Sequence, residues 1–167
     1  MKWRDRARIG VMGPSACPGE TLALARRVGQ LIAQAGGIVV CGGGRGVMEA
    51  AARGAQEAGG LTIGILPGDD ASEANPYVDL PVVTGLGNAR NAINVLTSQA
   101  IIAIGGASGT LSEIALALKC GRPVVGLKTW TLTPPENQEP PSIHYASTPE
   151  EAVAVALKLA HFSHQVS

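Results

Sequence analysis

The chain has 167 residues, of which 46% are hydrophobic and 16% are charged, and its 13 basic residues balance 13 acidic ones. This length predicts one domain, residues 1–167, large enough to bury a core without disulfide or metal cross-links. The zero net charge excludes a generally basic nucleic-acid coat and leaves little repulsion against self-association, so we expect no nucleic-acid partner. No uninterrupted apolar stretch reaches about 18 residues, so we expect no membrane partner either.

Short apolar runs alternate with longer helical patterns along the chain. Runs without polar alternation are typical of strands buried on both faces, and we expect strands at residues 8–12, 38–41, 61–66, 81–84, 100–104, 123–127 and 143–146. Apolar stripes at helical spacing, bounded by Gly or Pro, predict helices at residues 20–35, 47–58, 88–99, 108–120 and 149–162. The alternation predicts an α/β fold of three layers, with a mainly parallel sheet and helices on both faces.

Two longer segments show neither pattern. Residues 68–79 are polar and carry Asp, Asn and Pro, which predicts a loop. Residues 129–142 hold four prolines and are expected to be irregular. This second segment could form a lid, an interface arm or an ordinary surface excursion.

Cysteine and histidine spacing gives no metal or redox motif. The three cysteines, Cys17, Cys41 and Cys120, form no C-x-x-C pair, which favours reduced thiols in a cytoplasmic protein. His161 and His164 are two ligands in a polar tail. A metal site needs more ligands than these two, so we expect none.

Two turns, each between a predicted strand and a predicted helix, are rich in glycine. The first glycine turn, residues 42–46, reads Gly-Gly-Gly-Arg-Gly, and the second glycine turn, residues 105–109, reads Gly-Gly-Ala-Ser-Gly. Glycine lets the backbone approach a ligand, and the following helix N-terminus attracts anions. Because ligands bind beyond the carboxyl ends of parallel strands, the turns predict a phosphate or carboxylate site, with helix–sheet packing as the alternative. The predicted binding residues are Gly13, Ser15, Gly42, Gly43, Gly44, Arg45, Gly46, Arg90, Gly105, Gly106, Ser108, Gly109 and Thr110.

Neither turn matches a common nucleotide-binding fingerprint. A dinucleotide motif beginning at Gly42 would need a third glycine where Val47 stands. No G-x-x-x-x-G-K-[ST] sequence occurs, which excludes a P-loop NTPase.

Arg90 lies in a segment that carries three asparagines on an otherwise apolar predicted helix. Arg90 and Asn94 share one face of that helix at i,i+4 spacing. Polar groups on a buried face need partners. These partners could come from a ligand, a neighbouring loop or a second subunit.

Glu113 has two interpretations. The sequence from Thr110 to Glu113 matches a capping box, in which the glutamate accepts a hydrogen bond from a backbone N–H. Alternatively, a carboxylate next to a phosphate pocket could stabilise an oxocarbenium-like transition state or orient a water molecule. Without a partner acid, a single carboxylate is an incomplete hydrolytic set.

Together the two turns resemble the paired motifs of the LOG-like (Lonely Guy, or SLOG) superfamily. Residues 42–48 resemble its GGGxxGLM motif, and residues 105–113 resemble its PGGxGTxxE motif. The resemblance runs from Ile9 to Leu127. It implies a Rossmann-like fold and a homo-oligomer, either a dimer or a tetramer.

Members of the enzymatic branch of this superfamily are phosphoribohydrolases that release the base from cytokinin riboside 5′-monophosphates or AMP. In that branch an Arg-Lys pair and the last glutamate of the second motif serve the reaction. Arg90 and Glu113 match two of these positions and would be catalytic. Asn91 stands where the lysine is expected, and Ile104 replaces the leading proline.

Residues 85–91 and 112–119 are more similar to a second branch, the molybdenum cofactor carrier proteins. Those proteins bind a phosphate-bearing pterin and do not transform it. The resemblance therefore implies a non-enzymatic carrier for a phosphorylated heterocycle, with the molybdenum cofactor as cargo and no protein-ligated metal. The alternative is a nucleoside 5′-monophosphate phosphoribohydrolase, and a nucleotide-sensing module is a third hypothesis.

Overall fold

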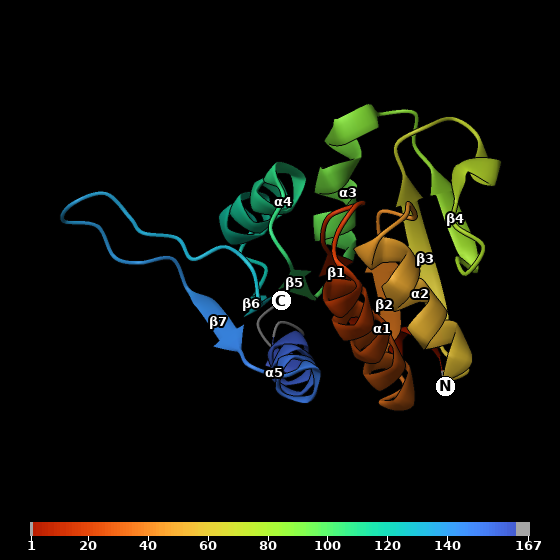
Figure 1. The fold of residues 1–167 in the computed structure, drawn as a ribbon, viewed down its shortest axis with the longest axis horizontal. Coiled ribbons are helices and arrows are strands. Elements are labelled where there is room, and N and C mark those ends of the chain that lie inside the picture. The colour runs from red at the N-terminus through yellow and green to blue at the C-terminus, as the bar shows by residue number, and fades with distance from the viewer. Residues whose placement is uncertain (1, 163–167) are drawn as a thin grey trace.

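The computed structural model describes residues 2–162, and a seven-stranded sheet forms its centre. Neighbouring strands pair in parallel in the order β4-β3-β2-β1-β5-β6-β7 (Figure 1). The strands are β1 (Arg8–Met12), β2 (Ile38–Cys41), β3 (Leu61–Leu66), β4 (Leu80–Val83), β5 (Ala100–Ile104), β6 (Val124–Leu127) and β7 (Ile143–Ala146).

Five α-helices in the described chain cover the two faces of this sheet. They are α1 (Gly19–Gln34), α2 (Val47–Glu57), α3 (Arg90–Thr97), α4 (Ser108–Lys119) and α5 (Pro149–Phe162). Helices α1, α2 and α5 pack on one face, and α3 and α4 pack on the other (Figure 1). The predicted three-layer α/β fold with a mainly parallel sheet is therefore confirmed.

The strands β2, β5 and β6 are apolar throughout because both of their faces are buried. In β5, Ile102 and Ile104 join the core beneath α1, α2 and α5, whereas Ile101 and Ala103 join the core beneath α3 and α4. All four side chains are fully buried. A strand with one solvated face would instead alternate apolar and polar residues.

The strand order reverses direction at β1 and β5. From β1 the chain adds β2, β3 and β4 on one side, and it then returns to place β5, β6 and β7 on the other side. Such a reversal is a topological switch point, where the loops after the two central strands separate and leave a crevice. The loops after β1 and β5 therefore mark the expected ligand site.

The structure differs from the sequence prediction mainly at element ends. The helix predicted at residues 88–99 begins at Arg90, because Gly87–Ala89 form a separate 3-10 turn, and it ends at Thr97. The loop predicted at residues 68–79 contains a short 3-10 turn, Ala71–Glu73. Residues 129–142 hold no helix or strand and extend away from the sheet between β6 and β7 (Figure 1).

Candidate functional site

A cavity of ≈ 340 Å³ lies at the switch point. Its walls come from the loop after β1, the start of α2, the turn before α3 and the first turns of α4. This volume suits a small ligand. It brings together seven residues singled out from the sequence: Gly13, Ser15, Arg90, Ser108, Gly109, Thr110 and Glu113.

Helix α4 points an uncapped N-terminus at this switch-point cavity. Its N-cap residue, Ala107, has extended backbone and no side-chain cap, and the first turn carries no acidic residue. The N–H of Leu111 already bonds to the Ala107 carbonyl oxygen at 3.0 Å. The N–H groups of Ser108 and Gly109 precede that first helical bond, so they and the positive end of the helix dipole can receive an anion.

The capping-box interpretation of Glu113 is wrong. Helix α4 begins at Ser108, so Thr110 is its third residue and not its N-cap. The Thr110 hydroxyl is buried and has no hydrogen-bond partner in the described chain. Glu113 is only 8% exposed and lines the cavity. The carboxyl therefore lines the cavity and does not cap the helix.

Burial dominates the electrostatics of Glu113. Desolvation raises the pKa of its carboxyl to about 7, while Arg90 and the Asn94 side chain act in the opposite direction. Near neutral pH the carboxyl is thus divided between its protonated and charged forms. A group in this state can donate or accept a hydrogen bond, depending on what enters the cavity.

Arg90 connects α3 to the ends of two strands. Its Nη1 donates to the carbonyl oxygens of Gly42 and Ile65, both at 2.6 Å. Its Nε is buried without a partner in the described residues. Burial lowers the pKa of Arg90, and Glu113 acts in the opposite direction, so the guanidinium is a partly buried cation beside the Glu113 carboxyl.

Glycines of the first glycine turn pack closely against other parts of the protein. A methyl group on Gly42 would overlap the Arg90 guanidinium, and one on Gly46 would overlap the backbone of Pro14 and Ser15. The Asn75 Nδ2 bonds to the carbonyl oxygens of Gly43 and Gly44, at 3.2 and 2.8 Å. None of the five residues of this turn lines the switch-point cavity.

Arg45 lies apart from the cavity. It is exposed and lines a separate hollow of ≈ 590 Å³, together with Gly44, Glu49 and residues 72–76. Its place beside a phosphate therefore stays a prediction. The long-range contact of Asn75 with this turn was missed, because nothing in the local sequence pairs the two segments.

Side chains from the segment after β6 hold the second glycine turn in place. The Thr129 hydroxyl donates to the Gly105 carbonyl oxygen at 2.6 Å, and the Trp130 Nε1 donates to that of Ala107 at 3.2 Å. The Tyr145 hydroxyl in turn donates to the Trp130 carbonyl oxygen at 3.0 Å. The start of the proline-rich segment therefore fixes the turn that precedes α4, a role that sequence reasoning also missed.

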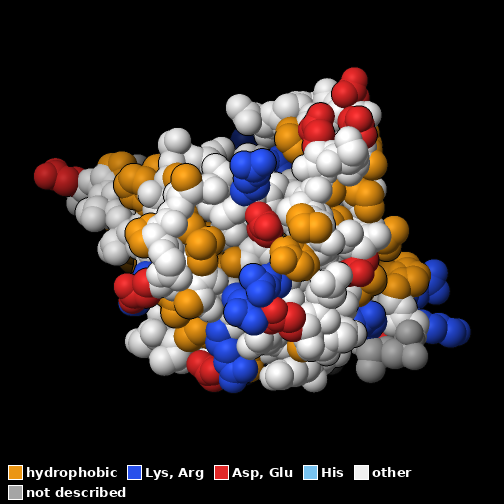
Figure 2. Space-filling model, turned by 45° about the vertical axis from the view of Figure 1, so that its right-hand side comes forward, with side chains coloured by type: hydrophobic (Ala, Val, Ile, Leu, Met, Phe, Trp, Pro, Cys, Tyr) orange, Lys and Arg blue, Asp and Glu red, His pale blue; other side chains and the backbone are white. Residues whose placement is uncertain are grey.

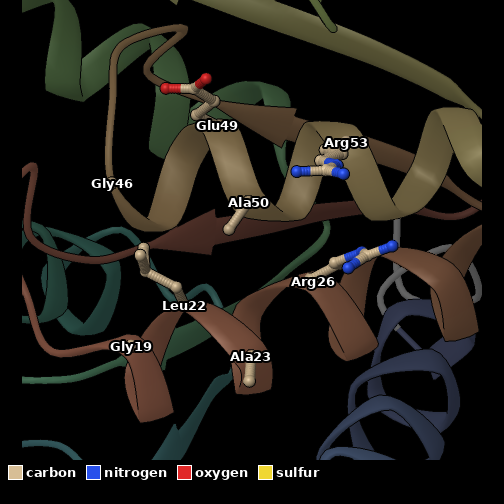
Figure 3. Close-up of a pocket in the computed structure, with 8 residues that line it drawn as sticks. All are labelled: Gly19, Leu22, Ala23, Arg26, Gly46, Glu49, Ala50 and Arg53. Atoms are coloured by element: carbon tan, nitrogen blue, oxygen red, sulfur yellow. The ribbon is translucent and has the colours of Figure 1, made fainter.

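A third hollow, of ≈ 440 Å³, runs between α1 and α2 (Figure 3). Arg26 from α1 and Arg53 from α2 both pair with Glu57, at 2.7 and 3.1 Å. These ion pairs satisfy both cations within the protein. Figure 2 shows acidic and basic side chains interspersed on the face that it presents. The hollow is thus an ordinary helix–helix groove. Among its lining residues, only Gly46 was predicted to bind a ligand.

Metal chemistry finds no support in the described part of the chain. Across residues 2–162, no group of three or more His, Cys, Asp or Glu side chains could hold a metal ion. The side chains of His161 and His164 lie outside the described residues. In the same part of the chain, no helix is long and apolar enough to cross a membrane.

Comparison with known proteins identifies the family. The SLOG cluster4 family model matches residues 6–153, and the chain belongs to this family. The predicted LOG-like resemblance is thereby confirmed.

Three similar proteins extend the comparison. The molybdenum cofactor binding protein of Rippkaea orientalis is 44% identical, with a TM-score of 0.84 over 92% of this chain and 97% of that one. The molybdenum cofactor carrier protein of Chlamydomonas reinhardtii is 40% identical, with a TM-score of 0.80 over 93% and 99% of the two chains. An uncharacterised protein of Archaeoglobus fulgidus is 46% identical over 146 residues, 87% of this chain and 91% of that protein.

Proposed function

Proceeding from this family membership, we propose that the chain is a carrier that binds a phosphorylated heterocycle and releases it unchanged, with the molybdenum cofactor as cargo. The observation that carries the proposal is the likeness to two molybdenum cofactor binding or carrier proteins, at 40–44% identity over more than nine-tenths of each chain. The cavity at the switch point supports it, because that is where a fold of this kind binds ligands.

The cavity offers separate groups to the two ends of such a ligand. The phosphate would bind at the N-terminus of α4, on Ser108 and Gly109, with Gly13 and Ser15 lining the same cavity. Arg90 would balance the negative charge. The other glycines of the two turns would shape this region through packing, whereas Arg45 lies apart from it.

Cargo binding is tested by the thermal stabilisation that molybdopterin confers on the purified protein under anaerobic conditions. Gly109→Asp places a carboxylate beside the anion site, where a side chain meets nothing within 4 Å, so we expect a folded protein that molybdopterin no longer stabilises. Gly19→Asp is the matched control, since Gly19 begins α1 and is equally open. Unchanged stabilisation of Gly109→Asp would contradict the assignment of this site.

A second candidate function is phosphoribohydrolase activity, favoured by one observation. Arg90 and Glu113, which match two catalytic positions of the enzymatic branch, share the cavity. Asn91 lines the same cavity where that branch has a lysine. Free base released from AMP or a cytokinin riboside 5′-monophosphate, and abolished by Glu113→Gln, would establish the enzyme. No release by folded protein would favour the carrier.

We also propose that the carrier is a homodimer or a tetramer. Leu86 and Leu96, just before α3 and within it, are 51% and 53% exposed, and Leu80 and Val83 on edge strand β4 are exposed as well. Several large apolar side chains exposed on and next to β4 and α3 favour an interface at these elements. Light scattering at micromolar concentration should give at least twice 17.0 kDa, and Leu96→Glu should lower this mass. A monomeric wild type would contradict the proposal.

The proposed location is the cytoplasm, with no nucleic-acid or membrane partner. All three cysteines, Cys17, Cys41 and Cys120, are free thiols, which suits a reducing compartment. The interspersed charges of Figure 2 form no basic field on the face shown. Fractionation of the source cells tests the location, and recovery of the protein in the membrane fraction would contradict it.

A further inference from the structure

Building on the proposed function, we propose that the part of the switch-point cavity lined by Arg90, Thr110 and Glu113, here called its floor, recognises the 2-amino-4-oxopyrimidine edge shared by pterins and guanine. In this arrangement the two oxygens of the Glu113 carboxylate accept the two adjacent N–H donors of that edge. Adenine-type ligands, which lack this pair of donors, are then disfavoured.

Three buried polar atoms without partners belong to residues around Glu113: Arg90 and Thr110, which line the cavity, and Asn94, which lies behind its lining. They are Arg90 Nε, Asn94 Oδ1 and Thr110 Oγ1, half of the six such side-chain atoms in the described chain. Asn94 is fully buried and Thr110 is 2% exposed. Native proteins rarely leave buried polar atoms unpaired, so a local concentration of them indicates a missing polar partner. A ligand in the cavity would supply it.

These atoms surround Glu113 from two helices. Arg90 and Thr110 line the same cavity as Glu113. Asn94 lies one turn after Arg90 on α3, and its side chain acts directly on the Glu113 carboxyl. The floor therefore combines a carboxyl, a guanidinium N–H and a hydroxyl, and the Asn94 amide supports the carboxyl from outside the cavity lining.

The donor pattern of the ligand decides which heterocycle this set fits. Along its edge, a 2-amino-4-oxopyrimidine presents an exocyclic amine, a ring N–H and a carbonyl oxygen, in that order. A carboxylate can accept both N–H groups in a bidentate contact, as it does from a guanidinium. The Thr110 hydroxyl or the Arg90 Nε–H can then donate to the carbonyl. Donors and acceptors match at each of these positions.

An adenine edge presents one amine donor beside a ring nitrogen that only accepts. Against a carboxylate, that ring nitrogen faces a second acceptor, which is repulsive. An amide or a protonated carboxyl, with one donor and one acceptor, fits adenine instead. The identity of the side chain at position 113 thus acts as a switch between the two kinds of base.

Electrostatics favour the charged carboxylate once such a ligand is bound. Burial outweighs the opposing effects of Arg90 and Asn94 and raises the pKa of Glu113 to about 7, but two N–H donors from a ligand would stabilise the charged form and lower that pKa. Glu113 follows Ser108 by five positions on α4, about 7.5 Å along the helix axis. The anion site and the carboxyl are therefore distinct positions, able to bind the two ends of one ligand.

Calorimetric titration with GMP and AMP at pH 8 tests the inference on the wild type, Glu113→Gln and Glu150→Gln. The wild type should bind GMP at least about tenfold more tightly than AMP, because the carboxylate makes two charge-assisted bonds to guanine. Glu113→Gln should remove or reverse that preference. Glu150→Gln, an exposed control on α5, should keep it. Equal wild-type affinities, no GMP binding, or an unchanged ratio in Glu113→Gln would overturn the inference.

Molybdopterin distinguishes failure of this inference from failure of the proposed function. If the wild type binds molybdopterin but shows no preference for GMP, the recognition by Glu113 is wrong and the carrier function stands. If it binds none of the three, both are wrong. Thr110→Val provides a second variant should Glu113→Gln not fold: loss of the hydroxyl donor should weaken GMP binding more than AMP binding. Equal weakening would count against the inference.

Discussion

The two glycine turns have the same position between a strand and a helix but different surroundings. The first turn, between β2 and α2, is filled by Arg90, Asn75 and the loop after β1. The second turn, between β5 and α4, is anchored on one side only, and its last residue, Gly109, faces an open cavity. A glycine-rich turn thus predicts that something approaches the backbone closely. In the first turn this is the protein itself, and in the second we propose that it is the ligand.

The largest expected effect comes from Gly46→Ala in the first turn. Gly46 has a φ of 66° and a ψ of −127°, which disfavours a side chain, and a methyl group there would overlap the backbone of Pro14 and Ser15. Strain and overpacking together should lower the free energy of unfolding by about 4 kcal/mol. Urea denaturation measures this change. A loss below about 1 kcal/mol would show that the first turn is not the rigid partner in the comparison.

Glu113→Gln should raise stability at alkaline pH. The pKa of Glu113 is about 7 in the folded chain against an ordinary value of 4.5, so the native state binds the proton more tightly than the unfolded state does. The free energy of unfolding therefore falls as pH rises from 4.5 through 7. Glutamine has no charge to bury, and the variant should exceed the wild type at pH 8 by up to about 3 kcal/mol.

The charged and titratable groups near Glu113 decide how this pH dependence is measured. Of the groups that act on Glu113, Arg90 is cationic throughout, and burial raises the pKa of the Cys41 thiol to about 11, so neither titrates between pH 4 and 8. Thermal unfolding at pH 4 and pH 8 should show the gain only at pH 8. The control, Glu150→Gln, should show no gain, and a pH-independent difference for Glu113→Gln would contradict the prediction.

The side-chain hydrogen bonds that hold the two turns should differ in their contribution to the free energy of unfolding. Asn75→Ala removes two bonds to the carbonyl oxygens of Gly43 and Gly44 from a side chain that is 7% exposed, and should cost about 2 kcal/mol. Thr129→Val removes one bond to the Gly105 carbonyl oxygen and should cost about 1 kcal/mol. Denaturation midpoints in urea rank the two variants. The reverse order would mean that the second turn is the more firmly held.

The sheet was predictable because its signals are local. The strands at residues 8–12, 38–41, 61–66 and 100–104 are largely apolar runs followed by Gly or Pro, and all four were placed with the observed bounds. Parallel pairing follows from strand–helix alternation. The sequence also indicated Arg90 and Asn94 as polar residues that need partners on a buried helix face.

The sequence could not predict that the first turn packs against the protein while the second faces the cavity, because this difference depends on contacts between distant segments. Arg90 lies 48 residues beyond the glycine that it covers, and Asn75 lies 31 residues beyond the nearer carbonyl that it binds. The misassigned capping box has a different, local cause. The sequence S/T-x-x-E would make Thr110 the N-cap of a helix that begins at Leu111, but α4 begins three residues earlier, at Ser108, as the predicted helix does, and its N-cap is Ala107. The carboxyl of Glu113 is thereby turned into the cavity.

Gly109→Ala should have the smallest effect on stability and a large effect on binding. A methyl group at this position meets nothing within 4 Å, and alanine is the better residue inside a helix. The free energy of unfolding should thus change by less than about 1 kcal/mol, against about 4 kcal/mol for Gly46→Ala. Gly109 lines the cavity, so the added methyl group lies beside the N–H groups that would hold the phosphate, and displacing the anion from one such bond should weaken molybdopterin binding at least about tenfold. Denaturation and titration of this one variant separate the two properties: intact binding would mean that the second turn, like the first, is glycine-rich for packing alone.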